Sequence, residues 1–163
     1  MANAGLRFAG APSKGTITAT FRDGAPSDRF VIQNNGSCPI AGATLTIDLK
    51  GSRGRLIFDT TAGGPGSLVY QPLRIVEGQA ALASGPTVAD GAESLTLNVG
   101  VLGGGDRIVF TIDVDDRESS VPTIVDGAEI AGAVIKLSGI ATARATFTDQ
   151  GEAVLAALPC ALS

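Results

Sequence analysis

The densest group of potential ligand residues in this 163-residue chain is a set of carboxylates in its second half. Asp113, Asp115 and Asp116 fall within four positions, and the window 106–129 holds seven acidic residues and two arginines, a net charge of −5. Residues two apart in a β-strand point to the same side, so we expect Asp113 and Asp115 to lie together. Asp116 follows at the strand end, where the chain can turn its carboxylate back toward them. Carboxylates held this close repel one another unless a cation lies between them.

Calcium is the cation that this ligand set predicts, because it accepts roughly six to eight oxygen atoms in flexible geometry. We expect Asp59, in a distant part of the chain, to contribute further oxygen ligands, together with the hydroxyls of Thr60 and Thr61, which follow it in the sequence. The spacing is not that of an EF-hand, and a solvated acidic edge that discourages aggregation is the alternative. Glycoside hydrolysis would also use two carboxylates, but six Phe, one Tyr and no Trp offer few platforms for a sugar.

Composition excludes several other classes of function. The chain has no histidine, which rules out Ser-His-Asp and Cys-His catalysis, histidine-ligated zinc and imidazole proton transfer. We therefore expect a protein that is not an enzyme. A net charge of −4 argues against nucleic acid as a partner, and no apolar run approaches the roughly 18 residues of a transmembrane segment.

Two cysteines, Cys38 and Cys160, stand 122 positions apart, with no CxxC motif. One interpretation is a pair of buried free thiols. The other is a single disulfide that ties the C-terminal strand to the Cys38-Pro39 turn, which would stabilise the fold by about 4 kcal/mol and indicate a location outside the cytosol.

These groups must be positioned by short strands, because apolar and polar residues alternate with a period of two. The inward series are Ala43, Leu45, Ile47 and Leu49; Leu95, Leu97, Val99 and Val101; and Ile108, Phe110, Ile112 and Val114. With 22 glycines and 8 prolines for turns, nine to eleven short strands follow. The expected fold is an all-β, antiparallel β-sandwich in one domain, residues 1–163, with a jelly roll or closed barrel as the alternative.

Finer expectations concern the irregular and late segments. Residues 78–84 are the one place for a helical turn, and residues 60–66 should form a structured loop. The last strands are expected at 130–137, 141–148 and 152–158.

Four runs of sequence resemble a known family. They are Thr44–Leu49, Phe58–Gly66, Phe110–Asp116 and Ala128–Ala133. In this order they resemble bacterial aggregation factor core proteins, which are similar to the ring-forming (Wreath) domain of sponge aggregation factors. The resemblance covers roughly residues 28–147. It implies an exported, non-enzymatic domain that associates with copies of itself in a calcium-dependent adhesion setting that also involves glycans.

The expected function is thus an extracellular structural domain of adhesion type, stabilised by calcium and homo-oligomeric as a ring or filament. A β-sandwich that binds glycans or another ligand is the alternative. The first residues lack the basic and apolar regions of a signal peptide. Either the protein stays inside the cell, or the leader of a secreted protein is absent from this sequence, and the second is our expectation.

Strand edges are the expected contact between copies. Monomeric proteins often protect such edges with lysine, and this chain has only Lys14, Lys50 and Lys136. The alternative is that coding composition accounts for the scarcity of lysine, with no bearing on assembly.

Overall fold

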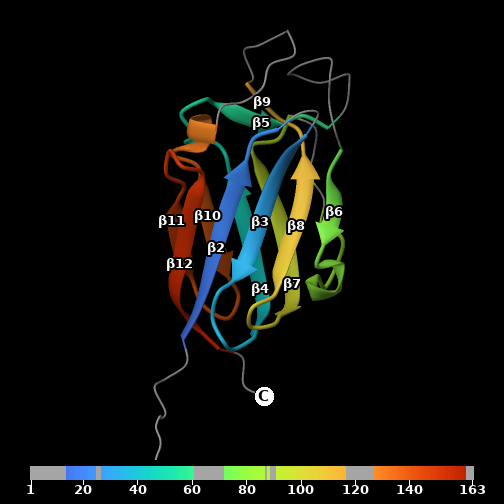
Figure 1. The fold of residues 1–163 in the computed structure, drawn as a ribbon, viewed down its shortest axis with the longest axis vertical. Coiled ribbons are helices and arrows are strands. Elements are labelled where there is room, and N and C mark those ends of the chain that lie inside the picture. Colours follow the sequence, from blue (N-terminus) through green and yellow to red (C-terminus); the bar gives the residue numbers. More distant parts are fainter. Residues whose placement is uncertain are drawn as a thin grey trace, which may run out of the picture.

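A computed structural model describes residues 14–24, 27–60, 72–86, 88, 91–116 and 127–160. These residues form eleven strands and two short 3-10 helices (Figure 1). The strands are β2 (Lys14–Arg22), β3 (Asp28–Asn34), β4 (Ile40–Asp48), β5 (Leu56–Phe58), β6 (Arg74–Glu77), β7 (Ser94–Leu102), β8 (Arg107–Ile112), β9 (Val114–Asp116), β10 (Val134–Ser138), β11 (Ala143–Thr146) and β12 (Glu152–Pro159). The helices are η1 (Gln79–Ala81) and η2 (Gly127–Ile130). No helix among the described residues is long and apolar enough to cross a membrane.

Two antiparallel sheets pack face to face. One has the strand order β11-β10-β4-β7 and the other β12-β2-β3-β8-β6, while the short pair β5-β9 lies across one end (Figure 1). The predicted β-sandwich and its number of strands are confirmed. No ladder joins the two large sheets in the described part of the chain, so the closed-barrel alternative is wrong.

Alternating apolar residues fill the space between the sheets, as their period predicts. A cluster of aromatic rings in this core packs around Phe30, which is fully buried. Its ring stacks on Phe110, directly opposite on β8, with centroids 5.1 Å apart, and contacts Phe21 at 5.0 Å. Phe58 and Phe147 lie 6.4 and 6.5 Å away. Because Phe30, Phe58 and Phe110 are each close in sequence to an acidic residue of the site described below, their packing anchors the strands that carry the site.

Val101 departs from the predicted pattern, because it points outward and is 57% exposed. The cause lies in the neighbouring strand. Gly42 of β4 has a φ of +65°, a left-handed conformation that glycine adopts readily, and the alternation of β4 slips there by one residue. β7 follows its partner, so that Leu102, opposite Ile40, takes the inward position.

Of the predicted late strands, those at 130–137 and 141–148 are shorter and begin later than expected, as Val134–Ser138 and Ala143–Thr146, whereas the strand at 152–158 is present as Glu152–Pro159. Residues 127–130 form η2, and β10 starts only at Val134. Of the predicted helical segment 78–84, Gln79–Ala81 is a 3-10 helix, whereas Leu82 forms a bridge with Val99 along the edge of β7. Most of the predicted loop at 60–66 lies outside the described residues.

Candidate cation-binding site

A break in one strand brings the acidic residues together. The sequence predicted a single strand through Asp113 and Asp115, but β8 ends at Ile112 and the chain passes through Asp113 into β9, which pairs with β5 instead. In this ladder Phe58 lies opposite Val114. The next residue pair continues the register, since the N–H of Asp59 donates to the carbonyl of Asp113 at 2.9 Å. Asp59 and Asp113 therefore lie opposite each other, with Asp115 two positions along on the same side.

The three carboxylates form a compact group. One oxygen from each of Asp59, Asp113 and Asp115 can be chosen so that all three lie within 4.8 Å of one another. Asp59 and Asp115 are only 0% and 1% exposed, and Asp113 is half-buried. Carboxylates are rarely this buried without compensation, because transferring their charge out of water is costly.

A fourth carboxylate, Asp28, lies beside this group and was not predicted. It begins β3 opposite Ile112 and is 2% exposed. Its two oxygens accept hydrogen bonds from the N–H groups of Gly24, at 3.0 Å, and Val114, at 2.8 Å. Asp28 therefore fixes the first residue of β9, and with it the direction in which Asp115 follows. A lone Asp at the start of a strand gives no sequence signal for this role.

Electrostatics within the group disfavour four simultaneous charges. Burial, together with repulsion from the other three carboxylates, raises the pKa of Asp113 from its ordinary 3.8 to about 8. Burial likewise raises the pKa of Asp28 to about 6, although the two backbone hydrogen bonds oppose this shift. At neutral pH and without a cation, Asp113 consequently holds a proton in most molecules. A bound cation would displace that proton and lower these pKa values.

The remaining predicted ligands are placed as follows. Asp116 pairs with Leu56 in the β5-β9 ladder, but its side chain lies outside what the structure describes. Thr60 follows Asp59 directly and is partly buried, whereas Thr61 also lies outside the described residues. Asp59, which the sequence suggested only as a distant contributor, is a central member of the group.

The donor set determines which ions would fit. All the identified donors are carboxylate oxygens, which suit hard cations such as Ca²⁺ and Mg²⁺ rather than zinc or copper. Three carboxylates supply part of the coordination of a calcium ion, and backbone carbonyls or water would complete it. The arrangement can thus bind a divalent cation between β5 and β9, two strands from distant parts of the chain.

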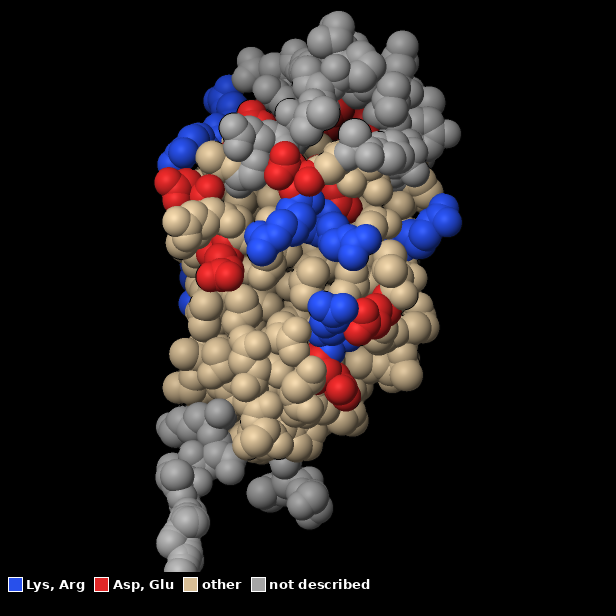
Figure 2. Space-filling model, in the orientation of Figure 1, with Lys and Arg blue, Asp and Glu red and all other residues tan. Residues whose placement is uncertain are grey.

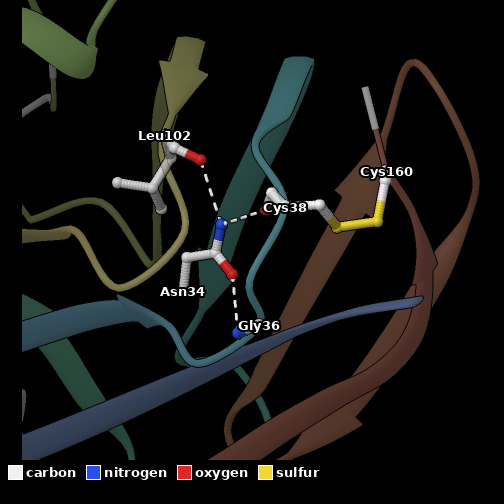
Figure 3. The surroundings of a disulfide bond; sticks show 5 residues. All are labelled: Asn34, Gly36, Cys38, Leu102 and Cys160. Carbon is white, nitrogen blue, oxygen red and sulfur yellow. Dashed lines mark hydrogen bonds between the residues drawn. A yellow bond between two sulfur atoms is a disulfide. The ribbon is translucent and has the colours of Figure 1, made fainter. Parts of the chain in front are cut away.

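The opposite end of the sandwich is held by neutral groups. Cys38 and Cys160 form a disulfide with Cα atoms 5.6 Å apart, so the disulfide alternative is the one that the structure contains (Figure 3). Beside it, the fully buried Asn34 side chain donates to the carbonyls of Cys38 and Leu102 at 2.9 and 3.0 Å. It also accepts a hydrogen bond from the N–H of Gly36 at 3.0 Å (Figure 3). This buried amide is therefore well satisfied.

Comparison with known proteins gives no match: neither a protein-family model, a curated protein nor a solved structure is similar enough to the chain. The resemblance to aggregation factor cores therefore stays a prediction, and the functional argument depends on the geometry of the chain itself.

Proposed function

We propose that this protein is a non-enzymatic structural module that binds calcium at the acidic end of its sandwich and associates with copies of itself outside the cytosol. The observation that carries the calcium part is the group formed by Asp59, Asp113 and Asp115, whose oxygens lie within 4.8 Å of one another while two of the residues are buried. Such an arrangement suits a small ion enclosed by carboxylates. It does not suit glycoside hydrolysis, in which two carboxylates flank the scissile bond of a sugar.

The two strands at the site explain how an ion would stabilise the fold. Asp59 follows β5, whereas Asp113 and Asp115 flank the first residue of β9. A cation shared by them would join the β5-β9 pair at the end of β8 and relieve the repulsion among the carboxylates. Since it binds only the folded arrangement, it would raise the free energy of unfolding by about 2.7 kcal/mol at a hundred times its dissociation constant.

Titration calorimetry with calcium chloride tests this part. We expect binding to the wild-type protein, accompanied by release of a proton from Asp113 at pH 7, so that the measured heat depends on the ionisation enthalpy of the buffer. Asp59→Asn should abolish the binding. Asp106→Asn, a matched change of an exposed residue at the other end, should leave it unchanged. An absence of heat at millimolar calcium, with the same melting temperature in calcium and in chelator, would contradict the proposal.

The disulfide supports a location outside the cytosol. Disulfides persist in oxidising compartments and are rare where glutathione and thioredoxin keep thiols reduced. Cys38 and Cys160 join the turn between β3 and β4 to the end of β12. Mass spectrometry of the protein from its native source, alkylated before and after reduction, would detect free thiols if this location were wrong.

Self-association was expected to use strand edges, and the edges of the two sheets are poor candidates. The register shifts in β6 between Ile75 and Glu77, and in β12 between Leu155 and Leu158. The edge of β7 is covered in part by residues 82–83, and β11 has only four residues. Bulges, covering segments and short strands are the devices that prevent edge pairing. We therefore assign the association between copies to a face of the sandwich, as argued in the next subsection.

Glycan binding, the alternative, would need a cleft. A cleft of about 500 Å³ lies between η1 and the β7–β8 turn, with Gln33, Glu77, Asp106 and Arg107 as its polar lining. Glu77 and Arg107 form an ion pair at 3.0 Å. None of the described residues that line this cleft is aromatic, so a sugar ring has no stacking platform there.

A further inference from the structure

A row of arginines crosses the outer face of the five-stranded sheet, here called the front face. Arg22 of β2 lies opposite Arg29 of β3, and Arg29 lies opposite Thr111 of β8. Thr111 in turn lies opposite Arg74 of β6, and all three arginines are exposed. Like charges directly opposite each other on a sheet destabilise it, so this row has an intrinsic cost.

The arginine row has few partners among the residues that the structure describes. Arg22 makes a long hydrogen bond of 3.5 Å to the carbonyl of Phe21. Within the described part of the chain, the side chains of Arg29 and Arg74 make neither a hydrogen bond nor an ion pair. The protein has a net charge of −4, yet this row holds three exposed guanidinium groups that contact no acidic side chain among the described residues, so the row suits an anionic partner.

Two exposed carboxylates that could pair with the arginine row of a second copy lie on the same front face. Glu152 of β12 lies opposite Thr20 of β2, which is the next outward residue after Arg22. Asp149 lies in the turn just before β12, and both acidic residues are exposed and form no ion pair with another described residue. Neighbouring strands are about 5 Å apart, so Glu152 is about 10 Å from the β3 strand that carries Arg29. Figure 2 shows acidic and basic side chains side by side across the upper part of this face.

Among the side chains that the structure describes, those on the rest of the front face over β12 and β2 are uncharged. Thr16 and Thr18 point outward from β2, and Val154 of β12, opposite Thr18, is 48% exposed. Figure 2 shows this lower part of the face without charged side chains. Small, uncharged residues on a sheet allow a second sheet to approach to about 10 Å, the normal spacing of a sandwich.

We propose that two copies of the chain pack front face to front face about a two-fold axis, with Arg29 of each copy against Glu152 of the other. A patch with adjacent positive and negative groups is self-complementary under two-fold symmetry, because each residue pair then occurs twice. A second copy is favoured over a nucleic acid or an acidic polysaccharide because its anions already stand on the same face. This inference rests on the self-association part of the proposed function and is independent of calcium.

Charge exchange between variants tests the pairing. Light scattering after gel filtration, at about 100 µM protein and low salt, should give twice the monomer mass of 16.3 kDa for the wild type. Arg29→Glu alone brings two carboxylates together at each contact, and Glu152→Arg alone brings two guanidinium groups together. Each should weaken dimerisation at least tenfold, since like charges then meet twice.

A mixture and a control complete the experiment. An equimolar mixture of the two variants should restore the dimer. In the mixed dimer the new Glu at position 29 of one variant meets the new Arg at position 152 of the other, and the second contact is the unchanged pair of Glu152 with Arg29, so both contacts are between opposite charges. Arg144→Glu, an exposed arginine on β11 of the other sheet, is the matched control and should dimerise like the wild type. The double variant Arg29→Glu with Glu152→Arg, in which every contact is again between opposite charges, should dimerise like the wild type as well.

Each contrary outcome has a distinct meaning. A wild-type monomer both in calcium and in chelator would overturn this interface and the self-association proposal together. An oligomer that persists in both single variants would overturn the interface alone. A double variant that stays monomeric, or a monomer that binds a sulfated polysaccharide through Arg29, would also refute the pairing of Arg29 with Glu152. Circular dichroism of each variant establishes that it is folded.

Discussion

The two ends of the sandwich bury polar groups in opposite ways. At the disulfide end, the Asn34 amide gives two hydrogen bonds to carbonyls and receives one from an N–H, and a covalent bond holds the chain beside it. At the acidic end, Asp28 receives two hydrogen bonds, but it shares its surroundings with Asp59, Asp113 and Asp115. The polar group at one end is therefore satisfied by hydrogen bonds, whereas the carboxylates at the other end repel one another, and protons or a bound cation would relieve that repulsion. We therefore regard the disulfide end as structural and the acidic end as the one whose stability can change with pH or cation concentration.

The largest expected effect comes from removing the covalent bond. The double variant Cys38→Ser with Cys160→Ser releases a loop of 122 residues and should lower the free energy of unfolding by about 4 kcal/mol. Because the disulfide is remote from the acidic residues, the loss should be the same in calcium and in chelator. Urea unfolding in both conditions measures it, and a loss that differed by more than about 1 kcal/mol between them would mean that the ends are coupled.

Replacing the Asn34 amide by a carboxylate should destabilise the disulfide end nearly as much as removing the disulfide. Asn34→Asp removes the two donated hydrogen bonds and places a carboxylate against the carbonyls of Cys38 and Leu102. We expect a loss of about 3 kcal/mol in urea unfolding at pH 7. Asn98→Asp is the matched control, since the Asn98 amide donates to Ser84 on the surface, and it should change stability by less than about 0.5 kcal/mol. Equal losses at the two positions would show that the Asn34 contacts contribute little.

Acidity should affect the acidic end in the direction opposite to ordinary acid denaturation. The folded protein holds protons on Asp28 and Asp113 up to a pH of about 6 and about 8, whereas the unfolded chain releases them near their ordinary value of 3.8. Between these limits the folded state binds more protons, so its stability falls as pH rises. In chelator we expect these two residues to lower stability progressively as the pH rises from about 4 to about 8. Saturating calcium should largely remove the decline, and a decline of the same size with and without calcium would contradict the site.

The smallest effect is a gain in stability. Asp113→Asn keeps the size of the side chain and removes one repulsive charge, so in chelator at pH 8 the variant should be more stable than the wild type by about 1 kcal/mol. In calcium the order should reverse, because the variant has lost a ligand. Thermal unfolding of both proteins in the two conditions measures this crossover. A variant that is less stable than the wild type in both would place Asp113 among residues with a purely structural role.

Much of the fold could be predicted from short stretches of sequence, because the alternation of buried and exposed residues in a strand is a local property. Ile108, Phe110 and Ile112 are buried as their spacing predicts, and so is the series Leu95, Leu97 and Val99. Val101 was predicted wrongly because its orientation follows a slip at Gly42, on another strand. A glycine with positive φ cannot be distinguished in the sequence from one in an ordinary strand.

The site divides in the same way. The sequence by itself determined that carboxylates two apart, Asp113 and Asp115, would lie on one side of an extended segment, and that no histidine could take part. Only the tertiary structure decided that β8 ends at Ile112, that β9 then pairs with β5, and that Asp59 continues this ladder. It alone also placed Asp28 against the N–H of Val114. Strand pairing and burial depend on residues far apart in the chain, so they decide which carboxylates meet and how strongly they repel.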